Sequence, residues 1–395
     1  MAAVPPPRAK PHRSAWWIVH HWAGLKLGLL LSFVLITGTI ATVADEIDWM
    51  VQPAMRARSE AGPMASWGAW HAAAAGVPGF TVEEVSAPIE PGFAVRAKGE
   101  DADGEARLVH IDPWTARVQG VTSTGTVQDV VRDLHRALML PTDIGIILVT
   151  VLSVPLLLTL ATAFKVYKKW WRGFVRWPRP MRHPREARRY IGDLHRLAGL
   201  WSIWFIALIG VTGLWYLADR LGAGPPEPEG PAVAATARPP SAVAIDAMIA
   251  GAIARWPDFD VRGIAFDNGR LTLQGQAGAM LVRDRANQAW FDARDGRVLG
   301  THDATGMSAY QRVSEAADPL HFGNWGGLPS KLLWFLFGTM LSALSVTGTL
   351  ICALRIAAPG KRLTGVVKQM GIGAVASVVL IVLAMVRLLQ LCGRG

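Results

Sequence analysis

The chain has 395 residues, of which 51% are hydrophobic, with a mean hydropathy of +0.27 and a net charge of +10. It is too long for one compact core and more apolar than a typical soluble domain, so we expect a membrane protein. The basic residues lie beside apolar runs, where they suit anionic lipid headgroups. The sequence pI of about 10.0 therefore does not indicate a nucleic-acid partner.

Five apolar runs are long enough to cross a membrane as helices: residues 23–44, 144–166, 197–217, 332–356 and 371–391. A secretory signal is the alternative for the first run, which ends in small residues, but the run is long for a signal core and four more follow. Residues 165–189 hold ten lysines and arginines against one acidic residue, Glu186. Because such loops stay inside, the N-terminus is predicted to be cytoplasmic.

These runs predict an α-helical integral membrane protein with about five transmembrane helices and two small α+β extracytoplasmic domains. The segments in order are a tail (1–15), span (16–44), outer domain (45–143), span (144–166), basic loop (167–190), span (191–219), linker and outer domain (220–330), span (331–357), loop (358–370) and fifth span (371–392). The cysteines Cys352 and Cys392 fall near opposite ends of their spans, too far apart to bridge.

Matching motifs recur in the same order in the two halves, which predicts an internal two-fold repeat. Residues 20–25 and 195–200 both open a span with a histidine followed four residues later by glycine. In the outer segments, residues 112–120 and 292–300 both run from an aspartate to Arg-Val-x-Gly. A Leu-His pair and then a proline precede the second and fourth spans: Leu134-His135 with Pro141, and Leu320-His321 with Pro329.

Each outer segment reads as a helix followed by short strands. The helices are expected at residues 67–75 and 243–255. In the second segment the strands are expected at residues 260–265, 270–274, 279–283 and 288–292, after a linker rich in Pro, Ala and Gly at 222–240.

Taken together, these motifs resemble the PepSY-associated transmembrane-helix family over about residues 16–357. The resemblance implies PepSY-like outer domains and location in a bacterial inner membrane. Members of this family include ferrisiderophore reductases that carry haem b. By resemblance, the expected substrate is a ferric siderophore or another ferric chelate, and the protein is expected to be an oxidoreductase whose catalytic residues the sequence does not assign.

Histidines at the span ends are the candidate haem ligands. His20 lies one helical turn before Gly24, and His195 lies one turn before Gly199, so each imidazole shares a face with a glycine that leaves room for a flat macrocycle. This pair is predicted to bind the iron of one haem. His21, which points about 100° away from its neighbour, is the alternative ligand.

His135 and His321 occupy matching places before the second and fourth spans and are predicted to bind a second haem at the outer interface. Arg136 and Arg196 directly follow candidate ligands and could pair with haem propionates, although snorkelling to the interface explains them equally well. A lone interfacial histidine is usually an anchor, and it is the repeated placement that favours ligation.

Electrons must come from another protein or from a quinol, because the sequence has no G-x-G-x-x-G after a strand, no G-x-x-x-x-G-K-[ST], no H-E-x-x-H and no C-x-x-C. The expected partners are therefore a cytoplasmic reductase or quinol, a ferric chelate and membrane lipid. The first alternative is a non-redox PepSY regulatory or binding protein, for example one that modulates a protease. A transporter ranks third, since it would be expected to have broken helices or charged residues near the bilayer midplane, and the sequence shows neither.

Overall fold

The computed structural model describes residues 14–58, 62–183, 186–236, 239–267, 269–356 and 371–392. The predicted tail at 1–15 lies largely outside these ranges, and the predicted loop at 358–370 lies entirely outside them. The chain forms two compact units. The helical unit comprises the residues up to Thr37, His135–Leu214 and those from Leu336 onward, and the sheet unit comprises Gly38–Leu134 and Trp215–Phe335.

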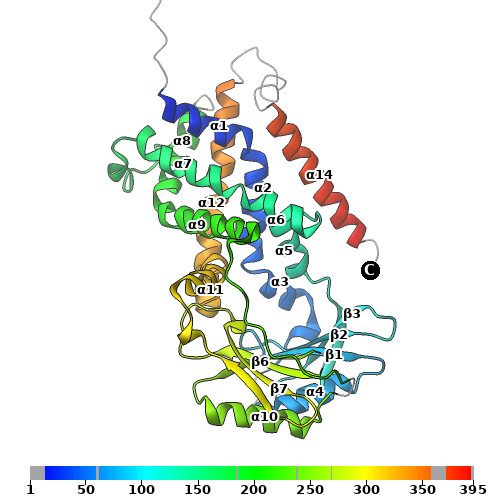
Figure 1. The fold of residues 1–395 in the computed structure, drawn as a ribbon. Helices are drawn as coiled ribbons and strands as arrows, with labels where there is room; N and C mark the ends of the chain where they lie inside the picture. The colour runs from blue at the N-terminus through cyan, green and yellow to red at the C-terminus, as the bar shows by residue number, and fades with distance from the viewer. Residues whose placement is uncertain are drawn as a thin grey trace, which may run out of the picture. The chain divides into compact units, whose positions relative to one another are not determined.

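Apolar helices make up the helical unit (Figure 1). They are α1 (Ala15–Lys26), α2 (Gly28–Ala41), α6 (Thr142–Thr150), α7 (Ser153–Val166), α8 (Ala187–Trp201), α9 (Ile203–Ala218), α12 (Gly327–Ile356) and α14 (Ile372–Cys392). Within the described ranges, three continuous helical segments are long and apolar enough to span a membrane: Thr142–Val166, Ile203–Ala223 and Gly327–Leu354.

The first predicted span is bent, because α1 and α2 meet at an angle of 66° around Leu27. Gly28 allows the backbones of α2 and α12 to approach closely, since a side chain there would collide with Thr349. The Thr349 hydroxyl donates a hydrogen bond to the Gly24 carbonyl at 3.4 Å, which satisfies part of the backbone near the bend. Apolar length alone therefore predicted the segment but missed the bend.

The third predicted span differs in detail. Residues 197–217 are divided between α8 and α9 at Ser202, so the long apolar segment begins at Ile203. The fifth predicted span corresponds to α14, Ile372–Cys392, which includes the apolar stretch Gly373–Val386. The predicted count of five spans is not confirmed, and the internal repeat stays a prediction.

The sheet unit contains one antiparallel sheet of eight strands in the order β4-β3-β2-β1-β5-β6-β7-β8. Its strands are β1 (Thr81–Ser86), β2 (Val95–Glu100), β3 (Ala106–Ile111), β4 (Val118–Ser123), β5 (Asp260–Asp267), β6 (Arg270–Gln276), β7 (Asn287–Asp292) and β8 (Val298–His302). At the centre, β1 pairs with β5 through Glu84 opposite Ala265 and Ser86 opposite Gly263. The two predicted outer modules thus share one continuous sheet.

The strand predicted at residues 279–283 is wrong. This segment is a loop, and its Ala279 and Val282 pack with Ala286 and Ala304 in a small satellite core. Apolar side chains produced the strand-like pattern, because burial under a loop selects the same residue types as burial in a sheet. The predicted helices are confirmed as α4 (Trp67–Ala75) and α10 (Ala242–Arg255).

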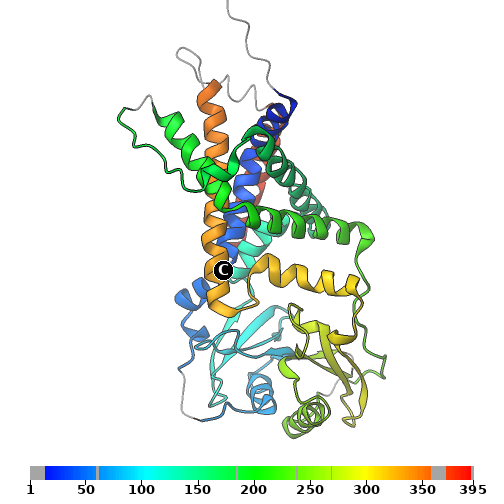
Figure 2. The same ribbon diagram turned by 90° about the vertical axis from the view of Figure 1, so that its left-hand side faces the viewer.

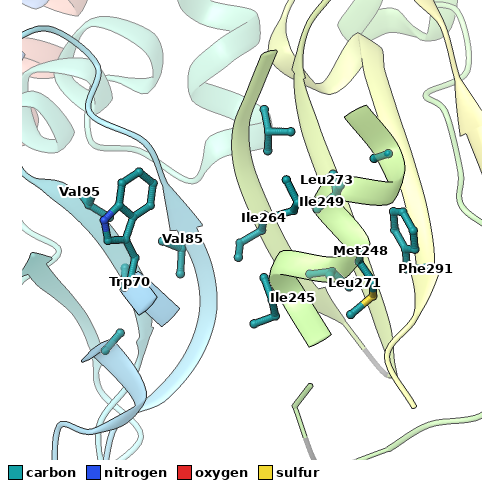
Figure 3. Packing of buried hydrophobic residues seen from close by; sticks show 14 of the residues in the cluster. Trp70, Val85, Val95, Ile245, Met248, Ile249, Ile264, Leu271, Leu273 and Phe291 are labelled. Carbon is teal, nitrogen blue, oxygen red and sulfur yellow. The ribbon is translucent and has the colours of Figure 1, made fainter. Parts of the chain in front are cut away.

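Helices α4 and α10 pack on one face of the sheet and enclose its main core (Figures 1 and 2). Figure 3 shows Ile245, Met248 and Ile249 of α10 directed at Leu271 and Leu273 of β6. Burying each such aliphatic side chain contributes about 1.5–3 kcal/mol. Helix α11 (Ala309–Phe322) lies over the opposite face (Figure 2). The unit also contains α3 (Ala44–Val51) and most of α5 (Val127–Ala137).

Candidate functional site

A cavity of about 420 Å³ lies in the helical unit and brings several of the sequence-predicted residues together. Its walls come from α1, α2, α7, α8, α9 and α12 and are mainly aliphatic and aromatic. Both His20 and His195 line it, together with Gly24 and Gly199. This volume lies within the range of about 300–1,000 Å³ that is typical of small-molecule and cofactor sites.

His20 is held by α7, which lies beside α1. Its Nδ1 lies 3.0 Å from the Thr159 carbonyl oxygen and 3.2 Å from the Thr162 hydroxyl. A carbonyl only accepts hydrogen bonds, so Nδ1 carries the hydrogen and donates it. The neutral ring then has its lone pair on Nε2, which is the nitrogen available to a metal.

His195 on α8 is held in the same way by α12. Its Nδ1 lies 3.1 Å from the Thr347 hydroxyl oxygen. That hydroxyl lies 2.7 Å from the Ala343 carbonyl and donates to it, so its oxygen remains an acceptor for Nδ1–H. Gly348 also belongs to this contact, because a Cβ there would lie 3.0 Å from His195 Cε1.

His21, the alternative ligand, lines the same cavity but makes different contacts. Its ring stacks on Trp17 with 4.7 Å between centroids, and its Nδ1 lies 3.0 Å from the buried Cys352 sulfur. The Nδ1 of His21 is therefore engaged, as that of His20 is, and His21 stays the alternative ligand.

Arg196 also lines the cavity. Its Nη1 donates to Asp193 at 2.7 Å, and its guanidinium lies 5.9 Å from the centre of the Tyr167 ring. The buried Nε has no hydrogen-bond partner among the described residues. An anionic group at this edge of the cavity would supply a hydrogen-bond acceptor for this nitrogen. Arg136, the other predicted propionate partner, is exposed on α5 and does not line this cavity.

The predicted outer pair is distributed over the two units. His135 belongs to the helical unit, where its Nδ1 lies 2.9 Å from the Val34 carbonyl oxygen. His321 belongs to the sheet unit, where its ring packs edge-on against Tyr216 at 5.2 Å. Their pairing stays a prediction. Among the residues with described positions, no three His, Cys, Asp or Glu side chains gather as ligands for a free metal ion.

Sequence reasoning missed Thr159, Thr162 and Thr347, which hold the cavity histidines. A signal was present, because Thr159 follows Pro141 at the same sequence distance at which Thr347 follows Pro329. Threonine within an apolar helix ordinarily bonds to its own backbone, so this match alone did not single these residues out.

Comparison with known proteins identifies the chain. The model of the PepSY-associated TM region matches residues 17–355. The chain belongs to this family. A similar protein is an uncharacterized protein of Pseudomonas aeruginosa strain PAO1, 27% identical over 246 residues. The match covers 57% of this chain and 61% of the length of that relative. The family and the apolar helices together make this PepSY-family chain a membrane protein.

Proposed function

We propose that this PepSY-family protein is a haem-b-containing transmembrane electron-transfer protein that reduces an extracytoplasmic ferric chelate of the ferrisiderophore type. One observation carries the proposal: two imidazoles from separate helices line a single apolar cavity, each held through Nδ1 so that Nε2 can bind iron. Histidines that bind metals usually donate the hydrogen of their other ring nitrogen to a nearby acceptor in this way.

The cavity residues fit one haem b in three respects. His20 and His195 supply two nitrogen donors, which suffices because a porphyrin contributes the other four. At Gly24 a Cβ would meet nothing within 4 Å, so the cavity is open along this wall. The unpartnered Nε of Arg196 suits a propionate. Haem iron, when bound, carries one electron at a time between its ferric and ferrous states.

In this proposal the residues of the chain bind the haem, orient its ligand rings and surround it with apolar side chains. Thr162 and Thr347 orient the ligand rings, and aliphatic residues such as Leu31 and Leu344 give the cavity an apolar wall. In the proposed reaction a cytoplasmic reductase or a quinol is oxidised, and each ferric ion takes up one electron and leaves its chelator as the more weakly held ferrous ion. A quinol would supply two electrons and release two protons.

The outward direction rests on the basic loop at 165–189, whose charge favours a cytoplasmic position and a bacterial inner membrane with the N-terminus inside. We propose that His135 and His321 hold a second haem toward the outer side, which would complete the path. The ferric substrate rests on resemblance to ferrisiderophore reductases of this family.

An absorption spectrum of the detergent-solubilised protein, expressed with ample haem, is the first test. We expect a Soret band and reduced α bands of b-type haem. His20→Ala and His195→Ala should remove the same spectral species, and His21→Ala should be milder. Absence of a Soret band would contradict the proposal and favour the non-redox regulatory protein instead.

The substrate is tested in proteoliposomes. The haems are reduced, candidate ferric siderophores are added outside, and the haem spectrum is followed. We expect faster reoxidation with the ferric complex than with either the iron-free siderophore or its gallium complex, which has the same shape but accepts no electron. Equal reoxidation rates with the ferric, iron-free and gallium forms, across several siderophore classes, would contradict ferric reduction. The protein would then be an electron carrier with a different acceptor.

A further inference from the structure

We propose that Thr162 and Thr347 are positioning residues that select the Nδ1–H tautomer of the two cavity histidines and thereby set how strongly each ring binds ferric iron. The inference rests on the proposed function. It concerns two hydroxyls, one on α7 and one on α12, that the sequence did not single out.

Each hydroxyl has its hydrogen committed to its own helix. Thr162 donates to the Leu158 carbonyl at 2.7 Å, and Thr347 donates to the Ala343 carbonyl at 2.7 Å. Both residues therefore present only oxygen lone pairs to the imidazoles. A ring nitrogen facing such an oxygen must carry a hydrogen to avoid a lone-pair contact. The helix carbonyl thus fixes the threonine hydroxyl as its donor, and the threonine oxygen in turn requires the imidazole Nδ1 to be the donor.

The contacts at the two histidines are of the same kind. At His20 the Thr159 carbonyl also accepts from Nδ1, at 3.0 Å, and shares the role with Thr162 at 3.2 Å. At His195 the Thr347 hydroxyl accepts from Nδ1 at 3.1 Å, and the Leu344 carbonyl is a backbone hydrogen-bond partner of the same ring. Thr162 is itself 2% exposed, so water does not readily replace its hydroxyl.

Two effects follow from this bond. With one acceptor fewer on Nδ1, the other tautomer, which places a hydrogen on the nitrogen meant for iron, is less disfavoured. An imidazole whose Nδ1–H is hydrogen-bonded is also the more basic ligand and favours the ferric state. Removing a hydrogen-bond partner of a ligand histidine typically weakens metal binding by about 10–100-fold. A tenfold loss confined to the ferric state corresponds to a rise in midpoint potential of about 59 mV.

The test uses Thr347→Val, which keeps the shape of the side chain and removes the hydroxyl. The full-length protein is titrated with hemin after haem removal, its midpoint potentials are measured, and ¹⁵N shifts report the histidine tautomers in the haem-free state. We expect weaker haem binding by about tenfold or more, a higher potential and loss of the pure Nδ1–H form at His195. Thr347→Ser, which keeps the hydroxyl, should leave all three at their wild-type values, and Thr162→Val should act in the same direction at His20.

Thr150→Val is the matched control. Thr150 is also a buried threonine that donates to its own helix, at 2.7 Å to Ile146, but it does not line the cavity. It should leave haem affinity and potential unchanged. An Nε2–H tautomer at His195 in the haem-free wild type, or wild-type affinity and potential in Thr347→Val, would overturn the inference. A wild-type protein that binds no hemin would instead overturn the proposed function, and the ¹⁵N shifts would still test the Thr347 contact.

Discussion

Gly24 and Gly348 both line the cavity, but they differ in what a side chain would meet there. At Gly348 a Cβ would lie 3.0 Å from His195 Cε1, so the missing side chain lets α12 approach the imidazole. At Gly24 the same construction meets no atom within 4 Å. Glycine at position 24 is therefore not needed for helix packing, and its place in the wall leaves space for a ligand.

Gly24→Leu should fill the cavity without disturbing the fold. Forcing extra methylenes into an occupied space costs about 1–3 kcal/mol, and about 1.4 kcal/mol is a factor of ten in affinity. We therefore expect haem content to fall about tenfold, measured by absorbance per protein, with unchanged thermal unfolding of the haem-free protein. Gly251→Leu on α10 is the control, because that glycine also faces open space but lies in the sheet unit. A wild-type Soret band in Gly24→Leu would place the ligand elsewhere.

His110 is a buried titratable residue in the sheet. It lies on β3 with 0% exposure, and its Nε2 lies 2.9 Å from the Thr122 hydroxyl. Arg96 lies opposite on β2. Burial, assisted by the positive charge of Arg96, lowers the pKa of His110 from 6.5 to about 4. The ring is thus neutral in the folded protein throughout the physiological range.

This pKa predicts a loss of stability in mild acid. The unfolded chain binds a proton near pH 6.5, whereas the folded sheet resists protonation down to about pH 4. The contribution of neutral His110 to the free energy of unfolding is therefore fully present above pH 6.5. It is lost as the pH falls from 6.5 to about 4, by on the order of 3 kcal/mol in all. Thermal unfolding of the full-length protein at about pH 7.5 and about pH 5 measures the effect. His110→Gln should show a smaller decrease, and an identical decrease would assign it to other groups.

At the scale of elements, a carboxylate joins the two helices that cover the sheet. Asp246 of α10 accepts hydrogen bonds from the Gly68 backbone N–H at 2.8 Å and from the Ser66 hydroxyl at 2.7 Å. Both donors lie at the start of α4, where backbone N–H groups lack partners and the helix dipole favours a negative charge. Asp246 thus caps a helix that lies far away in sequence.

Asp246→Ala should destabilise the sheet unit by about 1–2 kcal/mol, because the start of α4 loses a charged acceptor. Asp246→Asn should cause a smaller loss of stability, since the amide oxygen of asparagine can still accept a hydrogen bond from the start of α4. Asp258→Ala, which changes an exposed aspartate in the turn after α10, is the matched control. Denaturant unfolding monitored through the sheet unit provides the measurement. Equal effects of the Asp246 and Asp258 substitutions would show that the cap contributes little.

The elements differ in how far sequence predicts them. Helices α4 and α10 were found at nearly their true bounds, because Ser66 and Ser241 cap them and apolar faces follow. The bend at Leu27 was not found, since hydropathy does not register that Gly28 packs against Thr349. The residues of the site likewise differ in how far sequence predicts them. His20 and His195 could be predicted from repetition, whereas their threonine acceptors depend on which helices lie together.

At the scale of the whole molecule, sequence patterns described each outer segment as a separate module. They could not show that β1 and β5 pair, because every strand of an antiparallel meander has the same alternation whether its neighbour is local or distant. The main core is likewise shared, with Trp70 and Val85 from one half and Ile245 and Ile264 from the other (Figure 3). Neither half of the sheet has a complete core of its own.

The β1–β5 pairing has a consequence for biogenesis. The segment between β4 and β5 contains two of the helices that can span a membrane, Thr142–Val166 and Ile203–Ala223. The edge of β1 is therefore synthesised long before its partner, and at about 5–20 residues per second the interval is roughly 10–35 s. During that time β1 presents unpaired backbone groups, a state prone to aggregation. The sheet can therefore be completed only after both of these helical segments have been synthesised, which couples the folding of the soluble part to the order in which the membrane helices emerge.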